Sequence, residues 1–368
     1  MQLKRLSLQD YRNYDQMEFQ TDNMVNIIVG PNAQGKTNLL ESIFVLALTK
    51  SHRTHQDKEL IRWNASSTLL HAEVEKRYGT VQLDLSISQQ GKKAKVNGLE
   101  QKKLSNFIGA LNVVMFAPED LEIVKGSPGI RRRFLDMEIG QVYPSYLYDL
   151  SQYNKILQQR NNYLKQLFSS PGKASMLDVW NEQLMQFGVK IMKKRQSFIK
   201  KLQAWAEKIH AGITNGSEQL RIEYDCTLSH ALEQEDAVLF DYFMIKLSQV
   251  KDQELRRGVS LVGPHRDDLR FYINDKEVQT FGSQGQQRTT ALSLKLAEIE
   301  LIREEVGEYP LLLLDDVLSE LDRYRQTQLI ETFQRKVQTF ITTTGIESID
   351  LSKLESASVI QVRDGSLT

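Results

Sequence analysis

The 368-residue sequence contains a single cysteine, Cys226, so an internal disulfide framework is excluded. Its apolar runs all fall well short of the roughly 20 residues that a membrane-spanning helix needs. No signal-peptide core follows the first residues, Met1 to Arg5. These absences predict a cytoplasmic protein that does not associate with membranes.

The chain also lacks an excess of charge of either sign, because 47 basic residues are balanced by 47 acidic ones. No global field therefore attracts it to a polyanion, and any nucleic-acid-binding surface must be a local patch. With 40% hydrophobic and 26% charged residues, the chain can bury a full core, and its length predicts two or three lobes.

A glycine-rich loop is the clearest motif in the sequence. Residues 30–37 match the pattern G-x-x-x-x-G-K-[ST], and they lie between an apolar run at 25–29 and a helix-like segment that begins at Asn38. Strand, loop and helix in this order are the context that a phosphate-binding P-loop requires. The residues predicted to bind the nucleotide here are Gly30, Pro31, Asn32, Ala33, Gln34, Gly35, Lys36 and Thr37.

The chemistry of this loop predicts binding of ATP or GTP. Lys36 is expected to reach the terminal phosphates, and Thr37 to offer its hydroxyl group to Mg²⁺. The alternative is a glycine loop that matches the pattern by chance, and a second motif makes that alternative weaker.

The second motif is Pro310-Leu-Leu-Leu-Leu-Asp-Asp, an apolar run that ends in two carboxylates and predicts a strand buried on both faces of a parallel sheet. Asp315 stands where a Walker-B aspartate holds Mg²⁺. Asp316 would then lie beside the γ-phosphate and orient or deprotonate the attacking water. Lys36 and Asp315 stand near opposite ends of the chain, so both ends must fold into one nucleotide site around a large insertion.

The material between these motifs changes its periodicity along the chain. Alternating segments at 69–75, 81–87 and 93–98 predict strands. From about Pro144 apolar and aromatic residues recur at helical spacing, which predicts two long helices forming a hairpin around a break at 169–172. Their aromatic stripes fit either a partner-binding face or, as we favour, the core of a lobe.

Three groups of basic residues are candidates for a local DNA-binding patch. The first is Lys92, Lys93 and Lys95, and the second is Lys190, Lys193, Lys194 and Arg195; for both, a solvated face is the favoured interpretation. The third group, Arg131 to Arg133, fits equally a phosphate site or a tie between lobes.

A third motif, Gly282-Ser-Gln-Gly-Gln-Gln-Arg288, precedes a helix-like segment, then the apolar strand with its two acids, and then Ser319-Glu-Leu-Asp322. This series resembles the signature, Walker-B and D-loop motifs of ABC-type ATPase heads. The amino-acid sequence of these motifs is similar to that of the bacterial RecF family of DNA replication and repair ATPases, which are related to Rad50 and SMC heads. The match extends to residues 8–14, 50–54, 116–121, 127–136 and 263–268.

The resemblance implies an α/β fold of the ABC-type P-loop head, with a mixed sheet and helices, plus a helical lobe II that carries a short helical hairpin, as in Rad50 and SMC heads. It divides the chain into an N-terminal part of ATPase lobe I (1–125), the helical insertion (126–255) and a C-terminal ATPase part (256–368). The insertion is too short for the long coiled coils of SMC and Rad50.

The resemblance also implies further site residues. Ser283 would complete the nucleotide site of a second subunit in trans, with Gly285 and Gln286 beside it. Arg53 would lie in the arginine-bearing loop after the first helix, and Glu119 would fill the Q-loop position as a candidate Mg²⁺ contact.

Several positions depart from the pattern of transporter ATPases. Glu119 and Asp120 stand in place of the Q-loop glutamine, and Asp316 stands in place of a glutamate. No histidine follows the strand-like segment 338–344, so Thr343 or Thr344 would serve as the switch. These departures suggest slow turnover.

The function implied is an ATP-dependent DNA clamp of recombinational repair, with weak, DNA-stimulated ATPase activity and ATP-driven homodimerisation. Such a protein binds single-stranded, gapped or junction DNA and works with other recombination mediators in recombinase loading, replication restart and SOS induction. Two alternatives are an ATP-binding subunit of an ABC transporter and a scaffold that binds ATP without hydrolysing it.

Overall fold

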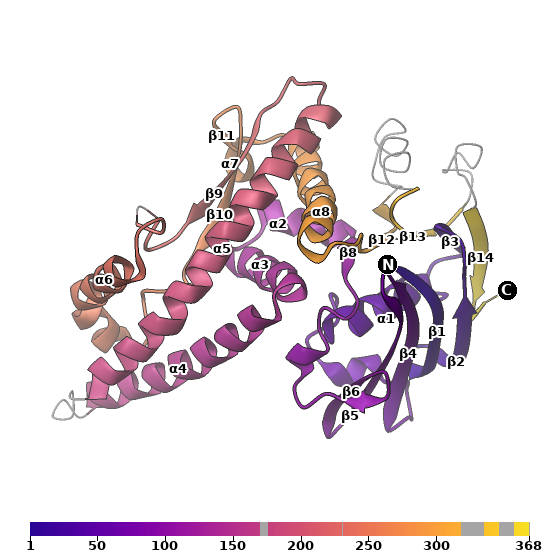
Figure 1. Cartoon of the computed structure of the whole chain (residues 1–368), viewed down its shortest axis with the longest axis horizontal. Coiled ribbons are helices and arrows are strands. Elements are labelled where there is room, and N and C mark those ends of the chain that lie inside the picture. Colours follow the sequence, from indigo (N-terminus) through magenta and orange to yellow (C-terminus); the bar gives the residue numbers. More distant parts are fainter. Residues whose placement is uncertain (170–175, 230, 318–334, 346–356, 368) are drawn as a thin grey trace. The chain divides into compact units, whose positions relative to one another are not determined.

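The computed structural model (Figure 1) describes most of the chain. The described ranges are 1–169, 176–229, 231–317, 335–345 and 357–367. The segment at 319–322 that resembles a D-loop lies outside them. Two compact units are formed: unit 1 comprises Met1–Asp120 and Leu294–Thr368, and unit 2 comprises Leu121–Ser293.

Unit 1 contains a six-stranded sheet around the strand that precedes the P-loop. Its order is β15 (Ser366–Leu367), β14 (Ala357–Arg363), β3 (Val25–Val29), β13 (Thr339–Thr343), β12 (Leu311–Asp315) and β8 (Val113–Phe116). All neighbours pair in parallel except β14 and β15, which form an antiparallel hairpin. Every residue of β12 and β13 is buried, as the continuous apolar run at 311–314 predicts.

The second sheet of unit 1 is antiparallel throughout. Its order is β2 (Tyr14–Gln20), β1 (Gln2–Tyr11), β4 (Ser67–Lys76), β5 (Gly79–Ser88), β6 (Gly91–Val96) and β7 (Leu99–Glu100). The strands predicted at 69–75, 81–87 and 93–98 are found here, in a sheet of their own and not beside the P-loop strand. Alternate residues of β4 and β5 are buried, because one face of this sheet covers the core.

Helix α1 (Lys36–Leu48) contacts strands of both sheets of unit 1. Eleven of its thirteen residues are buried, which explains why its sequence is apolar on nearly every side. Three short 3₁₀ helices, η1 (Asp57–Leu60), η2 (Leu104–Asn106) and η3 (Pro118–Asp120), connect the remaining elements.

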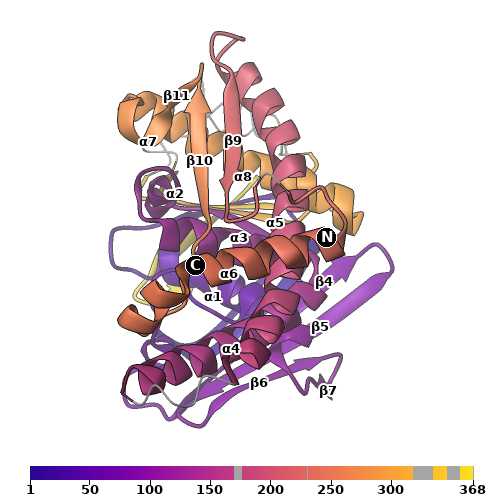
Figure 2. The ribbon, with the colours of Figure 1, turned by 90° about the vertical axis from the view of Figure 1, so that its left-hand side faces the viewer.

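Unit 2 is mainly helical, with one small antiparallel sheet (Figure 2). Its helices are α2 (Leu121–Lys125), α3 (Pro128–Val142), α4 (Pro144–Ser169), α5 (Leu177–Ile213), α6 (Asp236–Arg257), α7 (Val278–Phe281) and the first part of α8 (Gln284–Val306). The sheet order is β11 (Lys276–Glu277), β10 (Asp268–Ile273) and β9 (Leu220–Asp225). The predicted helix pair corresponds to α4 and α5, which pack against each other.

Half of the aromatic residues in the stripes of α4 and α5 lie in the core of this lobe, whereas Trp180, Phe187 and Trp205 are half-buried. Tyr146, Tyr153 and Phe198 are each at most 2% exposed. The favoured interpretation of these stripes is therefore confirmed for these residues, because side chains that are covered within the lobe cannot form a face for a partner.

The second unit boundary differs from the division expected at 255/256. Residues 256–293, which the sequence places in the ATPase part, group with unit 2. The reason is the pairing of β10 with β9 along six residues from Asp268 to Ile273, which attaches this segment to the helical lobe.

Three of the basic candidates hold the fold together instead of facing solvent. Arg131 donates from Nε and Nη2 to the two carboxylate oxygens of Asp268, at 2.6 and 2.8 Å. Arg195 is 1% exposed and lies 2.7 Å from Asp136. Lys92 donates to Thr49 O at 2.6 Å, at the end of α1.

The interpretation of these three side chains as a basic surface patch is thus wrong, and so is that of a phosphate site at Arg131. Each guanidinium or ammonium group is buried against a carboxylate or carbonyl partner, which offsets the cost of removing its charge from water.

Within the described ranges, no helix combines the length and apolar character needed to cross a bilayer.

Candidate nucleotide site

The P-loop connects β3 to α1 in unit 1, and its backbone departs from ordinary strand and helix geometry. Gly35 caps α1 at φ +117°, a conformation that glycine adopts without strain. A Cβ atom on Gly30 would lie 2.4 Å from Val362 O of β14, so only glycine fits there. The loop residues at 30 and 35 are therefore fixed by the fold of unit 1 as well as by any ligand.

Lys36 lies at the start of α1 and folds back over the loop. Its Nζ donates to Gly30 O at 2.7 Å and to Pro31 O at 2.8 Å, and the residue is 8% exposed. Burial lowers the pKa of Lys36, although the carboxylates of Asp316 and Asp315 act in the opposite direction. The ammonium group thus lies within the loop, where bound phosphates would replace carbonyls as its partners.

Asp315 ends β12 and is held by two hydroxyl groups. Thr37 Oγ1 donates to Asp315 Oδ1 at 3.0 Å, and Thr342 Oγ1 donates to the same oxygen at 2.7 Å. The Thr342 hydroxyl also accepts the backbone N–H of Asp316 at 2.9 Å. Asp316 itself has φ +53° and an exposed side chain. The structure therefore brings the two ends of the chain together at one site, as the two motifs predict.

The residues at this point fit Mg²⁺. A threonine hydroxyl and an aspartate oxygen 3.0 Å apart offer the hard oxygen donors that Mg²⁺ takes in P-loop proteins, where waters and phosphate oxygens supply its other ligands. In the part of the chain that the structure describes, no group of three His, Cys, Asp or Glu side chains could form a protein-only metal site.

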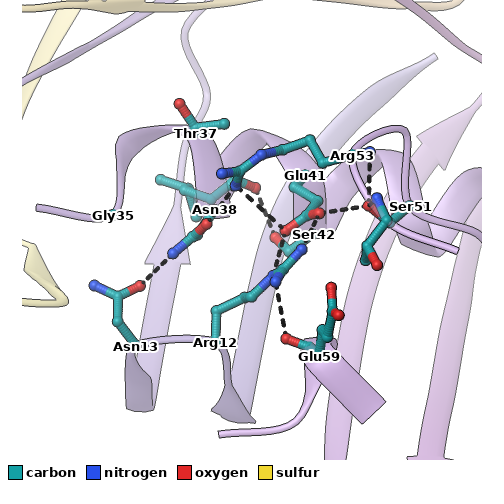
Figure 3. A network of polar contacts seen from close by, with 12 residues as sticks. Arg12, Asn13, Gly35, Thr37, Asn38, Glu41, Ser42, Ser51, Arg53 and Glu59 are labelled. Carbon is teal, nitrogen blue, oxygen red and sulfur yellow. Dashed lines mark hydrogen bonds and ion pairs between the residues drawn. The ribbon is translucent and has the colours of Figure 1, made fainter. Parts of the chain in front are cut away.

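A buried glutamate organises the loop that carries Arg53 (Figure 3). Glu41 lies one turn after Thr37 on α1 and accepts from Arg12 Nε and Nη2, at 2.8 and 2.6 Å, and from Ser51 Oγ at 2.6 Å. Burial alone would raise the pKa of Glu41, but these hydrogen bonds and the nearby guanidinium charges lower it. Glu41 is therefore an ionised anchor for the loop after α1.

Arg53 is placed beside the first turn of α1 by this anchor. Its Nη1 donates to Asn38 Oδ1 at 2.9 Å and lies 4.0 Å from Glu41. Ser51 Oγ accepts the backbone N–H of Arg53 at 2.9 Å. Arg53 thus lies next to the residue that follows Thr37, as Figure 3 shows.

His52 is a neighbour that the motifs did not single out for this site. Its ring meets Phe44 edge-on, with centroids 5.3 Å apart. Burial lowers the pKa of His52, while the carboxylates of Glu41, Asp315 and Glu119 act to raise it. Glu119 itself is exposed in η3. The loop after α1, the Walker-B strand and the Q-loop position therefore lie within electrostatic reach of one imidazole.

The outer side of the P-loop is held by the chain's N-terminal hairpin and its last strands. Asn13 Nδ2 donates to Gln34 O at 3.0 Å, and Tyr14 OH donates to Gly35 O at 3.0 Å. From the β14–β15 hairpin, Asp364 N and Gly365 N donate to Gln34 Oε1 and O, at 2.7 and 3.1 Å. These contacts orient the loop through its carbonyl oxygens and the Gln34 side chain and do not use its backbone N–H groups.

The residues of the third motif lie in unit 2, at the start of α8. Ser283 and Gly285 are exposed, and Gln286 is half-buried. A Cβ atom on Gly285 would meet only Ser283 Oγ, at 3.9 Å, so the fold of this chain does not itself demand glycine there. A glycine that its own chain leaves uncrowded suits a surface that something else approaches closely.

Sequence reasoning missed two kinds of residue in this site. One is Thr342, whose hydroxyl group contacts Asp315. The candidate switch at Thr343 or Thr344 stays a prediction. Thr343 bonds to Gly345 of its own loop. β13 is buried along its whole length, so no alternation in its sequence could have selected Thr342. The other is Glu41, for which the only indication in the sequence is that an acidic residue stands one helical turn after Thr37 of the P-loop.

A P-loop strand, a Walker-B strand, helix α1 between two sheets and an exposed signature segment on a helical unit define an ABC-type ATPase head. The chain belongs to the family described as RecF/RecN/SMC N terminal domain, which it matches over residues 2–366. The resemblance inferred from the motifs is therefore confirmed.

Individual relatives show which members of this family the chain resembles. The chain is 54% identical to a protein of Bacillus subtilis (strain 168) described as DNA replication and repair protein RecF, with all of both chains covered. The solved structure of a protein described as recombination mediator protein RecF-ATP in the RecFOR pathway is 33% identical, with a TM-score of 0.93 over 100% of this chain and 96% of that one. An Smc head domain from Pyrococcus furiosus shares the fold alone, at 16% identity and a TM-score of 0.56, with 100% and 95% covered.

Proposed function

We propose that this chain is an ATP-dependent DNA-binding protein of recombinational DNA repair, with ATPase activity. The observation that supports it most directly is the hydrogen bond of 3.0 Å between Thr37 of the P-loop and Asp315 of the Walker-B strand. It assembles a phosphate and metal site from the two ends of a chain whose relatives are named as DNA replication and repair proteins.

Different side chains and backbone N–H groups of this chain would have different roles in ATP binding and hydrolysis. Lys36 and the P-loop N–H groups would hold the β- and γ-phosphates, and Thr37 and Asp315 would hold Mg²⁺, with Glu119 as a further candidate ligand. Bound Mg²⁺ would neutralise part of the negative charge of the phosphates. Asp316 would orient the attacking water, and Arg53 would face the nucleotide from the loop after α1.

The signature residues would act on a second copy of the chain. Ser283, Gly285 and Gln286 lie in unit 2, exposed or half-exposed at the N-terminus of α8, where backbone N–H groups and the helix dipole favour a phosphate. Each nucleotide would thus be enclosed between the P-loop of one protomer and the signature of its partner in a two-fold homodimer. ATP would favour the dimer, and slow hydrolysis would release it.

DNA would bind the dimer, with single-stranded, gapped and junction DNA as candidate ligands and other recombination mediators as protein partners. Because each protomer carries no net charge, DNA binding would depend on two modest basic patches that dimerisation joins, which would together supply a useful number of phosphate contacts. Recombinase loading, replication restart and SOS induction in the cytoplasm are the processes we assign to it, and we expect DNA to stimulate the weak ATPase.

DNA binding can be tested by fluorescence anisotropy on gapped, single-stranded and duplex DNA, with and without ATP and Mg²⁺. We expect ATP to strengthen DNA binding by the parent protein and to have no effect on Lys36→Ala, which lacks the ammonium group that holds the phosphates. Lys36→Arg should keep nucleotide binding and lose hydrolysis, because the planar guanidinium does not reproduce the point contact. ATP affinity in Lys36→Ala equal to that of the parent would refute the P-loop assignment.

The two alternatives from the sequence make different predictions. A transporter subunit would sediment with membranes on cell fractionation, and the full-length match to repair proteins disfavours it. A scaffold that binds ATP without cutting it would release no phosphate even at saturating DNA and high protein concentration, where we expect release.

A further inference from the structure

A continuous series of hydrogen bonds links the signature serine to the last turn of the long helix α5, entirely within unit 2. It begins at the N-terminus of α8, where Ser283 N–H donates to Gln286 Oε1 at 2.9 Å and Gln286 N–H donates to Ser283 Oγ at 3.2 Å. This reciprocal pair is a capping box, in which the first and fourth residues satisfy each other's backbone donors.

The side chain of Gln286 is held from its other end by Glu218. Gln286 Nε2 donates to Glu218 Oε1 at 2.9 Å. The amide group therefore uses its oxygen on Ser283 and its nitrogen on Glu218, which fixes its orientation and removes the rotational freedom that a surface glutamine normally has. Gln286 of the signature motif is thereby tied to a residue 68 positions earlier in the chain.

Glu218 reaches this position because of the way α5 ends. Gly216 adopts φ +75°, and its N–H donates to Ala211 O at 2.8 Å, which turns the chain back along the helix. Glu218 Oε2 then lies 3.0 Å from Nε2 of His210, a fully buried residue in the last turn of α5. One carboxylate thus receives Gln286 on one oxygen and His210 on the other.

His210 is fixed from both sides. Its Nδ1 lies 3.0 Å from Ser293 Oγ, and the Ser293 hydroxyl donates to Thr289 O at 2.7 Å on α8. Ser293 on α8 and the carboxylate of Glu218 therefore contact the two ring nitrogens from opposite sides and hold the imidazole in one orientation.

We propose that Glu218 and His210 are positioning residues for the signature motif. Through Gln286 they hold Ser283 and the first turn of α8 in the geometry that receives the nucleotide of a second copy of this chain. The inference rests on the proposed function. It assigns to the end of α5 a role in the ATPase that is separate from nucleotide binding, because the P-loop belongs to unit 1 and these residues belong to unit 2.

The test is an exchange of the amide and the carboxylate. Gln286→Glu alone places two carboxylates against each other. Glu218→Gln alone leaves a single oxygen for the two groups that contact Glu218, His210 Nε2 and Gln286 Nε2, so one of them loses its acceptor. We expect each single variant to lower kcat for ATP hydrolysis roughly tenfold and to weaken ATP-driven dimerisation. Binding of a fluorescent ATP analogue by the monomer should stay at the parent value.

The double variant Glu218→Gln/Gln286→Glu should recover most of the lost kcat. The new amide at position 218 would accept from His210 through its oxygen and donate through its nitrogen to the new carboxylate at position 286. The second oxygen of that carboxylate would still accept from Ser283. Glu207→Gln is the matched control, since Glu207 lies one turn before His210 and also bonds to glutamine side chains, at 3.2 Å, but not to the signature. It should keep the parent kcat.

The outcomes separate this inference from the proposed function. If the single variants change only the melting temperature, or if the exchange fails to restore kcat, the positioning role is wrong while ATP-driven dimerisation stands. If Ser283→Arg, measured alongside, still hydrolyses ATP at the parent rate, the signature does not act in trans; the positioning role and the clamp mechanism then both fall, while the ATPase activity stands.

Discussion

At the scale of single residues, the two adjacent aspartates at the end of β12 have different surroundings and therefore different expected roles. Asp315 is 6% exposed and accepts from two threonines, whereas the side chain of Asp316 is exposed. A carboxylate fixed by hydroxyl groups suits a metal ligand, and one that faces solvent suits the activation of water.

Asp316→Asn should accordingly trap ATP. It removes the water-activating carboxylate and leaves Asp315, so ATP binding should persist while phosphate release falls by about 100-fold or more. Rapid-quench measurement of phosphate release, with equilibrium binding of ATP as the control, checks this. Hydrolysis at the parent rate would mean that another group activates the water, with Glu119 as the next candidate.

His52 carries a stability cost that the fold tolerates. Within the described ranges, neither of its two ring nitrogens has a hydrogen-bond partner, although both are buried. A buried polar group without a partner costs about 1–3 kcal/mol. His265 provides the contrast, because its Nδ1 meets Tyr153 OH at 2.6 Å and its Nε2 meets Ser260 O at 3.0 Å.

We therefore predict opposite effects for one substitution at these two histidines. His52→Leu should raise the free energy of unfolding by up to about 1 kcal/mol, since it removes unpaired nitrogens and loses only the edge contact with Phe44. His265→Leu should lower it by about 1–3 kcal/mol, because it leaves the buried Tyr153 hydroxyl without its partner, while Ser260 O keeps its two hydrogen bonds from Arg266. Urea unfolding at neutral pH measures both; destabilisation by both variants to the same extent would contradict the argument.

At the scale of elements, sequence reasoning succeeded where local chemistry demands fixed spacing. The P-loop, the buried Walker-B strand and the long helices were all identifiable, because each requires particular residue types a few positions apart. It failed where a charge is neutralised by a distant segment. Nothing near Arg131 or Arg195 in the sequence indicates that Asp268 or Asp136 will cover it, so the sequence alone leaves a phosphate site open at Arg131 and favours a solvated face at Arg195.

The C-terminal hairpin was another element that the sequence did not connect with the site. Its turn supports the P-loop through Gln34, and a Cβ atom on Gly365 would lie 2.6 Å from Asn13 O. Gly98, in the turn between β6 and β7, has nearly the same backbone angle, φ +76° against +73°, but no atom of the described residues lies within 4 Å of such a Cβ.

Gly365→Ala should therefore weaken ATP binding, and Gly98→Ala should not. Both variants lose about 1 kcal/mol of stability, because alanine is strained at this φ. Only Gly365→Ala also forces the hairpin away from Asn13 and loosens the hold on Gln34. Isothermal titration with ATP, together with thermal unfolding of both variants, separates the two effects. Equal ATP affinities would show that the hairpin does not support the loop.

At the scale of the whole molecule, the residues proposed to bind the nucleotide and the signature residues belong to different compact units. Lys36, Thr37 and Asp315 lie in unit 1, and Ser283 lies in unit 2. A substitution in one unit can therefore leave the local geometry of the other intact. This separation makes it possible to test nucleotide binding and dimer closure independently.

Ser283→Arg should leave ATP binding by the monomer almost unchanged, because the P-loop and its supporting contacts all lie in unit 1. A bulky cation at the exposed start of α8 should block the approach of the partner's nucleotide. ATP-induced dimerisation, ATPase activity and ATP-dependent DNA binding should then fall together, while the exposed position keeps the change in folding stability within about 0.5 kcal/mol. Sedimentation velocity with a non-hydrolysable ATP analogue measures dimerisation directly. A Ser283→Arg protein that dimerises with the analogue and holds DNA normally would disprove the clamp mechanism, even though the chain could still be a genuine ATPase.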